Sequence, residues 1–309
     1  MNKKIFVKST QGFGNKIISL IYCIYYYKIY KCNIYFIEVK SKHNIKDDIQ
    51  IKDIFLKTHD IINYKDISYI EYIKNKVSQF NINILNVYTE DCETLNDLPI
   101  YDKLEKYNVF IISFHLVKYM WDTFDEEDKK YFEINLNLID ENLRKYETEK
   151  YAVIHIRYGD KISIALQKNK SELYPIYTPK YYKKIISKLE KKSIKILLIT
   201  DSPILVKKFI LKKNINPNIK LIETHWLNAF YILLHGYYIY MSYSTFSFMA
   251  SYFNNNTNAK FYLLQKIKTN YNYLPEDDML LSKWIFFYKK KYILNYKKKL
   301  LQKMYKINL

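Results

Sequence analysis

Short apolar runs alternate with helical patterns throughout the second half of the chain. The runs with the length and composition of buried strands are Tyr151 to Ile156, Ile194 to Ile199, Ile219 to Ile222, Tyr238 to Met241 and Phe261 to Leu264. The segments between them that predict helices are Pro179 to Leu189, Pro203 to Lys212, Leu227 to Leu234 and Thr245 to Phe253. This alternation predicts an α/β fold, with helices on both faces of a parallel sheet.

Two of these helices have clear start signals. Pro179 and Pro203 stand where the first helical residue is expected, directly after Thr178 and Ser202. Proline suits that position, and a hydroxyl just before it can accept a hydrogen bond from an unpaired N–H of the first turn. We therefore expect Thr178 and Ser202 to cap their helices.

The beginning of the chain repeats the pattern once. A strand, a long apolar helix and a second strand are predicted at Ile5 to Val7, Asn15 to Tyr30 and Ile34 to Ile37. The turn between the first strand and the helix contains Gly12 and Gly14. Residues 41 to 146 mix polar helical patterns with isolated apolar runs such as Val109 to Phe114, and no topology follows from them.

The length of the chain favours two domains. Its 309 residues exceed the size at which one core normally stops growing. The polar stretch from Asp140 to Lys150 is the predicted boundary, which gives domains of residues 1–147 and 148–309. The tail from Asp277 to Leu309 interleaves lysines with aromatic residues. It predicts a basic helix that either packs on the body through one face or lies on an anionic membrane.

Composition changes how the charge is interpreted. The formal net charge of +19 would suit a nucleic acid, an anionic membrane or an anionic ligand. However, Lys, Ile, Tyr and Asn are abundant while Gly, Pro, Ala and Arg are scarce, as in the product of an AT-rich coding sequence. We therefore expect no nucleic-acid partner. The four glycines and two arginines are informative because a chain this poor in them keeps them where geometry demands it.

Neither a disulfide framework nor a membrane span is predicted. The chain has three cysteines, Cys23, Cys32 and Cys92, and no CxxC pair. The apolar residues after Lys4 are too few for a signal-peptide core. The longest apolar run, near Ala229 to Met241, falls short of the ~20 residues that span a bilayer. We expect a soluble, cytoplasmic protein, with membrane contact only at the periphery.

Charged residues stand at the end of the first predicted strand of the second half, Val153-Ile154-His155-Ile156-Arg157-Tyr158-Gly159-Asp160. Because residues two apart on a strand face the same side, His155, Arg157 and Gly159 share one face. Parallel sheets bind ligands at the carboxyl ends of their strands, and arginine suits bidentate recognition of a diphosphate. The alternative is a surface arginine paired with Asp160 or a glutamate.

Polar residues also follow two other predicted strands. After Thr200 come Asp201 and Ser202, where a carboxylate can accept from a guanine edge or a ribose hydroxyl. The alternative is that either residue only caps the next helix. After Met241 comes a hydroxyl cluster that includes Ser244 and Thr245. Such a turn at a helix N-terminus can bind a diphosphate, or its hydroxyls can simply be N-caps.

These motifs together resemble the alpha-1,2-fucosyltransferases, a family within a wider group that includes alpha-1,6- and protein O-fucosyltransferases. The segments that match, in the family's order, are Gly12 to Asn15, His155 to Asp160, Thr200 to Ser202 and Ser244 to Ser247. Thr178 to Lys184 and Ala229 to Gly236 are also similar to the family's intervening helices. The resemblance runs from Gly12 to about Phe253 and leaves residues 41 to 146 uncovered.

The resemblance implies a GT-B-type fold, in which two Rossmann-like domains with parallel sheets enclose a cleft. The donor binds in the second domain, and the first lies on the acceptor side. By motif, Arg157 holds the donor diphosphate with His155 beside it. Asp201, with Ser202 next to it, contacts the nucleoside. The remaining donor-site residues are Gly12, Gly14 and Asn15 on the first-domain turn, and Ser244, Thr245 and Phe246.

Some positions depart from the family pattern. Tyr158 stands where the family has a second arginine, and Gln11 where a further glycine is common. Tyr243 replaces an asparagine, and Phe248-Met249 replaces an aromatic pair. At Ser202 the chain is more similar to the protein O-fucosyltransferases. These departures leave the linkage and the acceptor open.

The predicted function is inverting transfer of fucose from GDP-fucose to a hydroxyl of a glycan acceptor, with an alpha-1,2 linkage as the first choice. The donor is a substrate, and neither a cofactor nor a metal is expected, in keeping with the absence of an Asp-x-Asp pair. Arg157 would stabilise the leaving diphosphate. His155, Asp160 or a carboxylate of the first domain would be the general base.

Other functions stay open. The same fold could use a different nucleotide-sugar donor, or the chain could be a protein O-fucosyltransferase. A basic membrane- or nucleic-acid-binding protein with a degenerate Rossmann domain is the non-enzymatic alternative. It is disfavoured because such a protein gains nothing from scarce Gly and Arg residues at strand ends.

Overall fold

The computed structural model describes residues 4–9, 12–38, 49–66, 68, 84–87, 108–111, 117–166, 176–211, 216–264, 284–287 and 298–308. The chain forms two compact units, and the first division between them falls between Leu138 and Ile139. The sequence-based boundary at 147/148 lies a few residues later.

The first unit contains a five-stranded parallel sheet in the order β3-β2-β1-β5-β4. Its strands are β1 (Lys4–Lys8), β2 (Asn33–Glu38), β3 (Ile62–Asp66), β4 (Ile84–Val87) and β5 (Asn108–Ile111). The helices described in this unit are α1 (Phe13–Tyr30), α2 (Ile51–Ile54), α4 (Val117–Asp122) and α5 (Glu126–Lys129). Short 3-10 turns span Leu56–Asp60, Lys130–Phe132 and Leu136–Leu138.

Helix α1 is the core helix of the first unit. A continuous run from Ile17 to Tyr26 is buried, because the helix is apolar on nearly all sides. Its carboxyl end is fixed by Lys28, which pairs with Asp125 and Asp128 at the start of α5. The predicted strand, helix and second strand at the N-terminus are confirmed. Of the predicted run Val109 to Phe114, β5 includes the first three residues, and residues 112–114 lie outside the described part.

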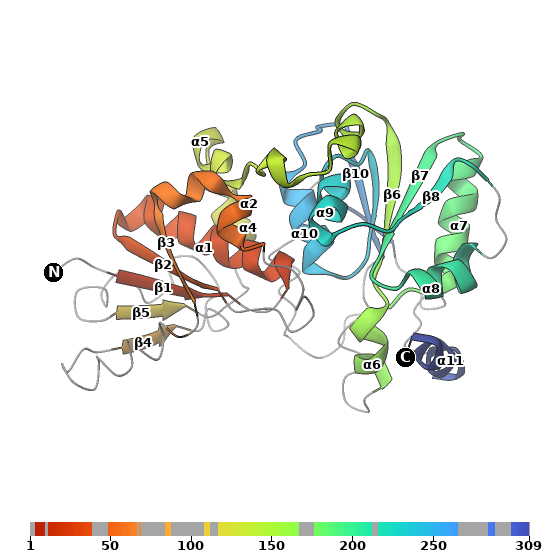
Figure 1. Cartoon of the computed structure of the whole chain (residues 1–309), viewed down its shortest axis with the longest axis horizontal. Coiled ribbons are helices and arrows are strands. Elements are labelled where there is room, and N and C mark those ends of the chain that lie inside the picture. Colours follow the sequence, from red (N-terminus) through yellow and green to blue (C-terminus); the bar gives the residue numbers. More distant parts are fainter. Residues whose placement is uncertain are drawn as a thin grey trace. The chain divides into compact units, whose positions relative to one another are not determined.

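The second unit contains a six-stranded parallel sheet in the order β11-β10-β9-β6-β7-β8. Its strands are β6 (Tyr151–Ile156), β7 (Lys195–Thr200), β8 (Ile219–Ile222), β9 (Tyr238–Met241), β10 (Lys260–Leu264) and β11 (Trp284–Phe287). Its helices are α6 (Gly159–Leu166), α7 (Pro179–Glu190), α8 (Pro203–Val206), α9 (Trp226–Leu234), α10 (Thr245–Phe253) and α11 (Lys298–Asn308). A 3-10 segment (Glu141–Glu147) precedes β6, and a π-helical turn (Lys207–Leu211) follows α8. Figure 1 shows helices packed around this sheet.

All five strands and all four helices predicted here are present, with ends that shift by a few residues. The helix expected over Pro203 to Lys212 is divided into α8 and the π-helical turn, and Lys212 lies outside the described residues. Thr178 caps α7 as expected, accepting a 3.3 Å hydrogen bond from the Tyr181 N–H. The same prediction for Ser202 is wrong, because its side chain makes no cap hydrogen bond to α8.

Strand order identifies the functional edge of each sheet. In the second unit the chain runs outward from β6 to β7 and β8, and then returns to place β9 on the other side of β6. In the first unit β1 lies between β2 and β5, so the order reverses beside β1. Ligands of open parallel sheets bind at the carboxyl ends of the strands that flank such a switch point. The relevant loops are therefore those after β6 and β9, and after β1 and β5.

Within the described part of the tail, helix α11 packs on the body through one face. It contacts α6 and α8, and the side chain of Met304 is fully buried. The rest of the tail, apart from β11, lies outside the described residues. None of the helices described in either unit is long and apolar enough to cross a membrane. Cys23 and Cys32 carry free thiols, and Cys92 is not among the described residues.

Candidate functional site

The carboxyl ends of β6, β7 and β9 lie side by side in the second unit. In the sheet register, Ile156 of β6 is level with Thr200 of β7, and Ile154 is level with Tyr240 of β9. The loops that begin at Arg157, Asp201 and Ser242 therefore leave the sheet at the same edge. Three of the four motifs found in the sequence thus belong to one site, which lies at the switch point between β6 and β9.

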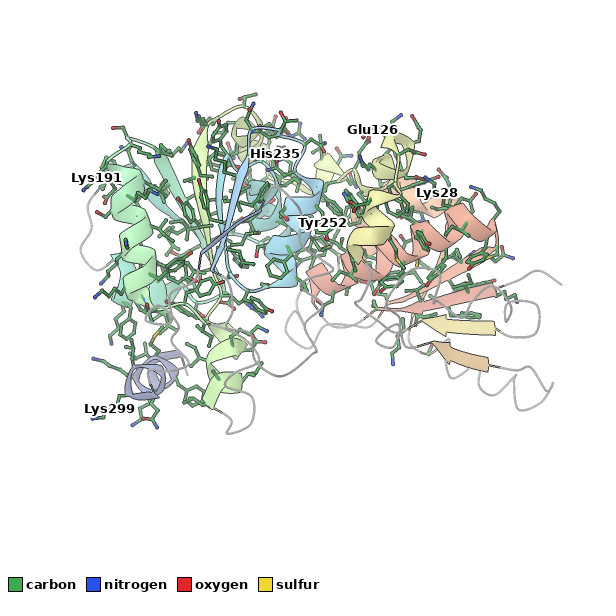
Figure 2. The ribbon with its side chains drawn as sticks, turned by 180° about the vertical axis from the view of Figure 1, so that it is seen from behind. Lys28, Glu126, Lys191, His235, Tyr252 and Lys299 are labelled. Atoms are coloured by element: carbon green, nitrogen blue, oxygen red, sulfur yellow. The ribbon has the colours of Figure 1, made fainter. Side chains whose placement is uncertain are left out.

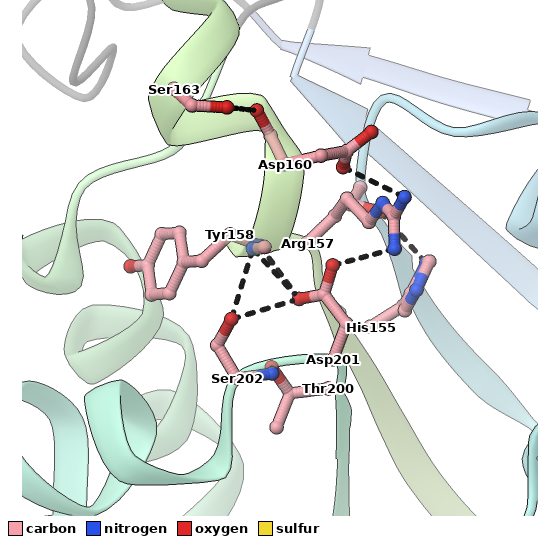
Figure 3. Close-up of polar contacts among 10 residues, drawn as sticks. His155, Arg157, Tyr158, Asp160, Ser163, Thr200, Asp201 and Ser202 are labelled. Carbon is pink, nitrogen blue, oxygen red and sulfur yellow. Dashed lines mark hydrogen bonds and ion pairs between the residues drawn. The ribbon is translucent and has the colours of Figure 1, made fainter. Parts of the chain in front are cut away.

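Arg157 is held between two carboxylates at this edge. Its Nη1 lies 2.6 Å from Asp201 Oδ2, and its Nη2 lies 2.8 Å from Asp160 Oδ1 (Figure 3). The guanidinium carries five N–H donors, and two of its nitrogens contact these carboxylates. The side chain is 30% exposed, and no further hydrogen bond engages it within the described residues, so its remaining donors can reach a ligand. The expected alternative pairing with Asp160 does form, but as one half of a fork that fixes the orientation of Arg157.

The carboxylate of Asp201 also holds the turn after β6. Its Oδ1 accepts hydrogen bonds from the backbone N–H groups of Tyr158 (3.0 Å) and Gly159 (3.1 Å). Asp201 therefore connects the ends of β6 and β7 through both backbone and side chain, as Figure 3 shows. This role is independent of any contact with a nucleoside. Among the described residues Oδ2 is bonded only to Arg157, so it can accept a further hydrogen bond from a nucleoside.

Ser202 supports the same turn rather than its own helix. Its hydroxyl accepts a 2.9 Å hydrogen bond from the Gly159 N–H and donates to Asp201 Oδ1 at 3.3 Å. Its backbone N–H donates to the Thr200 hydroxyl at 3.0 Å. Ser202 is 3% exposed, so its hydroxyl is committed to these contacts. The hydroxyl thus stabilises the backbone that presents Arg157.

Tyr158 points away from the site. It is fully buried, its hydroxyl donates to the Tyr177 carbonyl at 3.1 Å, and its ring meets Tyr182 edge-on. Burial raises the pKa of Tyr158 well above its usual range. Neighbouring residues of an extended segment face opposite sides, so anchoring Tyr158 in the interior turns Arg157 outward. Tyr158 therefore provides no second positive charge at this edge.

His155 is a buried, neutral side chain beside Arg157. It is 5% exposed, its Nδ1 lies 2.7 Å from the Ser242 hydroxyl, and its ring packs against Phe246 at 5.4 Å. Burial, reinforced by the charge of Arg157, lowers the pKa of His155 to about 3. Since an unfolded histidine titrates near pH 6.5, the unfolded chain binds the extra proton, and stability falls as the pH drops below that value.

The turn between β9 and α10 brings the hydroxyl cluster to the same edge. Ser244 occupies the N-cap position of α10, yet its side chain makes no cap hydrogen bond, so the N-cap interpretation is wrong for Ser244. Instead, the Ser247 hydroxyl stabilises the turn by donating to the carbonyls of Ser242 (3.0 Å) and Ser244 (3.2 Å). Phe246 packs between His155 and Phe230. Thr245 begins the helix, half-exposed at its N-terminus.

The glycine motif lies in the first unit, at the switch point of the other sheet. Gly12 directly precedes α1 with φ +93°, a conformation that favours glycine. Gly14 is buried in the first turn of α1, and Asn15 follows it. Gly12, Gly14 and Asn15 thus end the loop after β1, in the sheet of the first unit. Gln11 lies outside the described residues.

Sequence reasoning missed two residues of this edge. Ser242 was counted only as part of a hydroxyl cluster, and no pattern in the sequence pairs it with His155. Lys161, in the first turn of α6, is half-buried. Burial and the charge of Arg157 lower the pKa of Lys161, while the charges of Asp160 and Asp201 oppose that shift. Among the described residues, no group of three or more His, Cys, Asp or Glu side chains could hold a metal.

Comparison of the whole chain with solved structures identifies the architecture. A crystal structure of POFUT1 in complex with GDP superposes with a TM-score of 0.50 and 13% identity, covering 85% of this chain and 98% of that one. The chain has the GT-B fold. The fucosyltransferase NodZ from Bradyrhizobium matches with a TM-score of 0.47 and 15% identity, over 82% of this chain and 92% of NodZ.

A third match, the E. coli heptosyltransferase WaaC with ADP, has a TM-score of 0.43 and 8% identity over 99% of both chains. No protein-family model and no curated protein sequence gives a significant match. At these identities the likeness establishes the GT-B fold alone. The two parallel sheets described above are the two Rossmann-like halves of that fold.

Proposed function

We propose that the protein is an inverting glycosyltransferase that moves fucose from GDP-fucose to a hydroxyl of a glycan acceptor. The observation that carries the proposal is the Arg157 guanidinium, fixed by Asp201 and Asp160 at the switch point of a GT-B sheet. The fucosyltransferase-like order of the motifs supports the choice of sugar. The GDP in the POFUT1 structure supports the choice of nucleotide.

The chemistry requires charge to be stabilised on the leaving group. The acceptor oxygen forms a bond to the anomeric carbon, the bond to the diphosphate oxygen breaks, and GDP leaves with the electron pair. The remaining donors of Arg157 and the N-terminus of α10 at Ser244 and Thr245 would meet the developing charge. One preorganised donor of this kind contributes about 3–4 kcal/mol to the transition state.

The acceptor proton needs a base, and the geometry narrows the choice. His155 has a pKa of about 3, and its Nδ1 is engaged by Ser242, so it is a weak base at neutral pH. Asp160 Oδ1 accepts a 2.8 Å hydrogen bond from Arg157 Nη2, so one of its carboxylate oxygens is already engaged. Asp160 and an unassigned carboxylate outside this edge therefore stay as the candidates for the base. The alpha-1,2 linkage and a protein acceptor stay as alternative forms of the proposal.

GDP should stabilise the protein more than UDP or ADP, because the proposed nucleoside contact is the Asp201 carboxylate, whose Oδ2 can accept a further hydrogen bond from the guanine edge. At a hundred times its Kd, a ligand adds about 2.7 kcal/mol to the free energy of unfolding. Thermal unfolding with each nucleotide, in buffer containing EDTA, measures this. Equal stabilisation by UDP would remove the guanine assignment. A GDP effect that needs added Mn²⁺ would remove the metal-independent mechanism.

Peripheral contact with an anionic membrane is a second proposal, favoured by the outer face of α11. Lys299, Lys303 and Lys306 line a groove of about 740 Å³ together with Leu166, Gln302 and Tyr305. No ion pair engages these three lysines within the described residues. Because the opposite face of α11 packs on α6 and α8, contact would be electrostatic, with no insertion of an apolar face.

Replacing the three groove lysines by glutamine should weaken binding to phosphatidylserine-containing vesicles by up to about 100-fold at physiological salt, at about 1 kcal/mol for each lysine. The matched control replaces Lys188, Lys191 and Lys192, which are exposed around the carboxyl end of α7. Figure 2 shows Lys191 at the opposite end of the second unit from Lys299. Vesicle co-sedimentation measures both variants. If they lose binding equally, only the net charge matters, and the α11 site is wrong.

A further inference from the structure

Ser242 makes a buried hydrogen bond across the switch point. It directly follows β9, and its hydroxyl lies 2.7 Å from Nδ1 of His155 on β6. Ser242 and His155 are 3% and 5% exposed. The ring plane of His155 is set separately, by Phe246, which itself rests edge-on against Phe230. The contact with Phe246 does not determine which ring nitrogen carries the proton. The hydrogen bond with Ser242 can determine this.

The hydrogen bond between Ser242 and His155 favours one tautomer of the histidine ring. If the Ser242 hydroxyl donates to Nδ1, the hydroxyl proton is used and the ring proton resides on Nε2. If Nδ1 instead donates to Ser242, the hydroxyl proton is left over. Among the described residues the Ser242 hydroxyl has no partner other than His155, so that arrangement buries an unpaired O–H. Leaving a buried donor unpaired is unfavourable. In the first arrangement the remaining donor is the Nε2–H, and Nε2 is not among the buried side-chain atoms of the described residues that lack a partner, so this donor can reach solvent or a ligand.

The second ring nitrogen is then available to a ligand. No hydrogen bond to Nε2 occurs within the part of the chain that is described, and the ring lies on the same strand end as Arg157. With its low pKa the ring stays uncharged across the neutral range. A neutral N–H beside a fixed guanidinium suits a diphosphate oxygen, because it adds a directional donor without a second competing cation.

We propose that Ser242 is a positioning residue that holds His155 as the neutral tautomer protonated on Nε2, which then donates to an oxygen of the bound diphosphate. The identity of that ligand rests on the proposed function. The tautomer does not, because it is set by contacts within the free protein. The two claims can therefore fail separately.

The first experiment measures the tautomer without any ligand. Long-range ¹H–¹⁵N spectra of protein labelled at its six histidines distinguish the two tautomers, and His155→Gln assigns the signal. We expect His155 to be protonated on Nε2 from pH 5 to 8, and to become a mixture of tautomers in Ser242→Ala. The control is Ser251→Ala, whose buried hydroxyl donates to the Phe248 carbonyl at 2.7 Å. A wild-type ring protonated on Nδ1, or an unchanged tautomer in Ser242→Ala, overturns the proposal.

The second experiment measures GDP affinity by calorimetry. Ser242→Ala should weaken GDP binding about tenfold, the expected loss of one hydrogen bond to a charged group. Ser242→Thr keeps the hydroxyl and should restore most of the affinity, and Ser251→Ala should bind as the wild type does. If Ser242→Ala alters the tautomer but binds GDP normally, the positioning role is wrong while the proposed function stands. If the wild type does not bind GDP, the proposed function fails, and the tautomer result is unaffected.

Should Ser242→Ala fail to fold, the wild-type spectrum and Ser242→Thr still decide the matter. The wild-type spectrum tests directly whether the His155 ring carries its proton on Nε2. A threonine variant that folds and retains the Nε2 proton supports the hydroxyl as its cause, whereas one that folds with an Nδ1 proton contradicts it.

Discussion

Replacing Arg157 by lysine should preserve the fold and lower kcat by about 100- to 1000-fold, the effect of losing one preorganised donor to developing charge. Arginine spans Asp201 and Asp160 with two arms and has further donors for the diphosphate. Lysine presents one compact charge that cannot bridge the same carboxylates and a ligand together. Tyr158 is buried in the interior, so no neighbouring guanidinium can compensate.

Steady-state kinetics with saturating donor measures the loss, and circular dichroism confirms folding. The chain supplies its own control, because its only other arginine, Arg144, is exposed on the 3-10 segment before β6. Arg144→Lys should leave kcat unchanged. The partly exposed Arg157 pairs contribute about 1 kcal/mol or less to stability, so a folded Arg157→Lys variant is expected. Near-normal turnover in that variant would mean that Arg157 serves only its surface ion pairs.

The elements of the second unit could be predicted because its sequence has strong periodicity. Strand β6 is buried along its whole length and reads as one apolar run, and α7 begins with a threonine cap and a proline. The same cap signal failed at Ser202. The local sequence is equally suited to capping there, but a partner 43 residues away, the Gly159 N–H, takes the hydroxyl. Long-range competition of this kind has no local signature.

The site could be predicted only in part for the same reason. Residues at strand ends follow from periodicity, so His155, Arg157 and Asp201 could be selected without coordinates. The pairing of Ser242 with His155, and the fork that holds Arg157, depend on which strands are neighbours. Strand order in turn depends on crossovers that periodicity does not encode. In the first unit, β3 and β4 escaped prediction because their apolar runs are short and isolated.

Glycine is scarce in this chain, and the packing around Gly159 shows why glycine is required at that position. A Cβ placed there would lie 2.3 Å from Asp201 Oδ2 and 2.9 Å from its Cγ, closer than real side chains approach. The carboxylate cannot simply swing aside, because it accepts hydrogen bonds from Arg157, Tyr158 and Gly159 itself. A side chain at position 159 would therefore clash with Asp201, and moving Asp201 to remove the clash would break the contacts that orient Arg157.

Gly159→Ala should accordingly weaken GDP binding about 10- to 100-fold and destabilise the protein by about 1–3 kcal/mol, the usual range for overpacking. Gly236→Ala is the matched control. Its added Cβ would lie 2.6 Å from Val153 Cγ1 and 2.8 Å from Ile239 Cγ1, so it overpacks the apolar interior of the same sheet without touching Asp201. Calorimetry with GDP and chemical denaturation separate the two effects. We expect similar losses of stability, with GDP affinity lost only in Gly159→Ala. If both variants bind GDP equally well, the contacts of Asp201 with the turn after β6 do not set the geometry of the donor site.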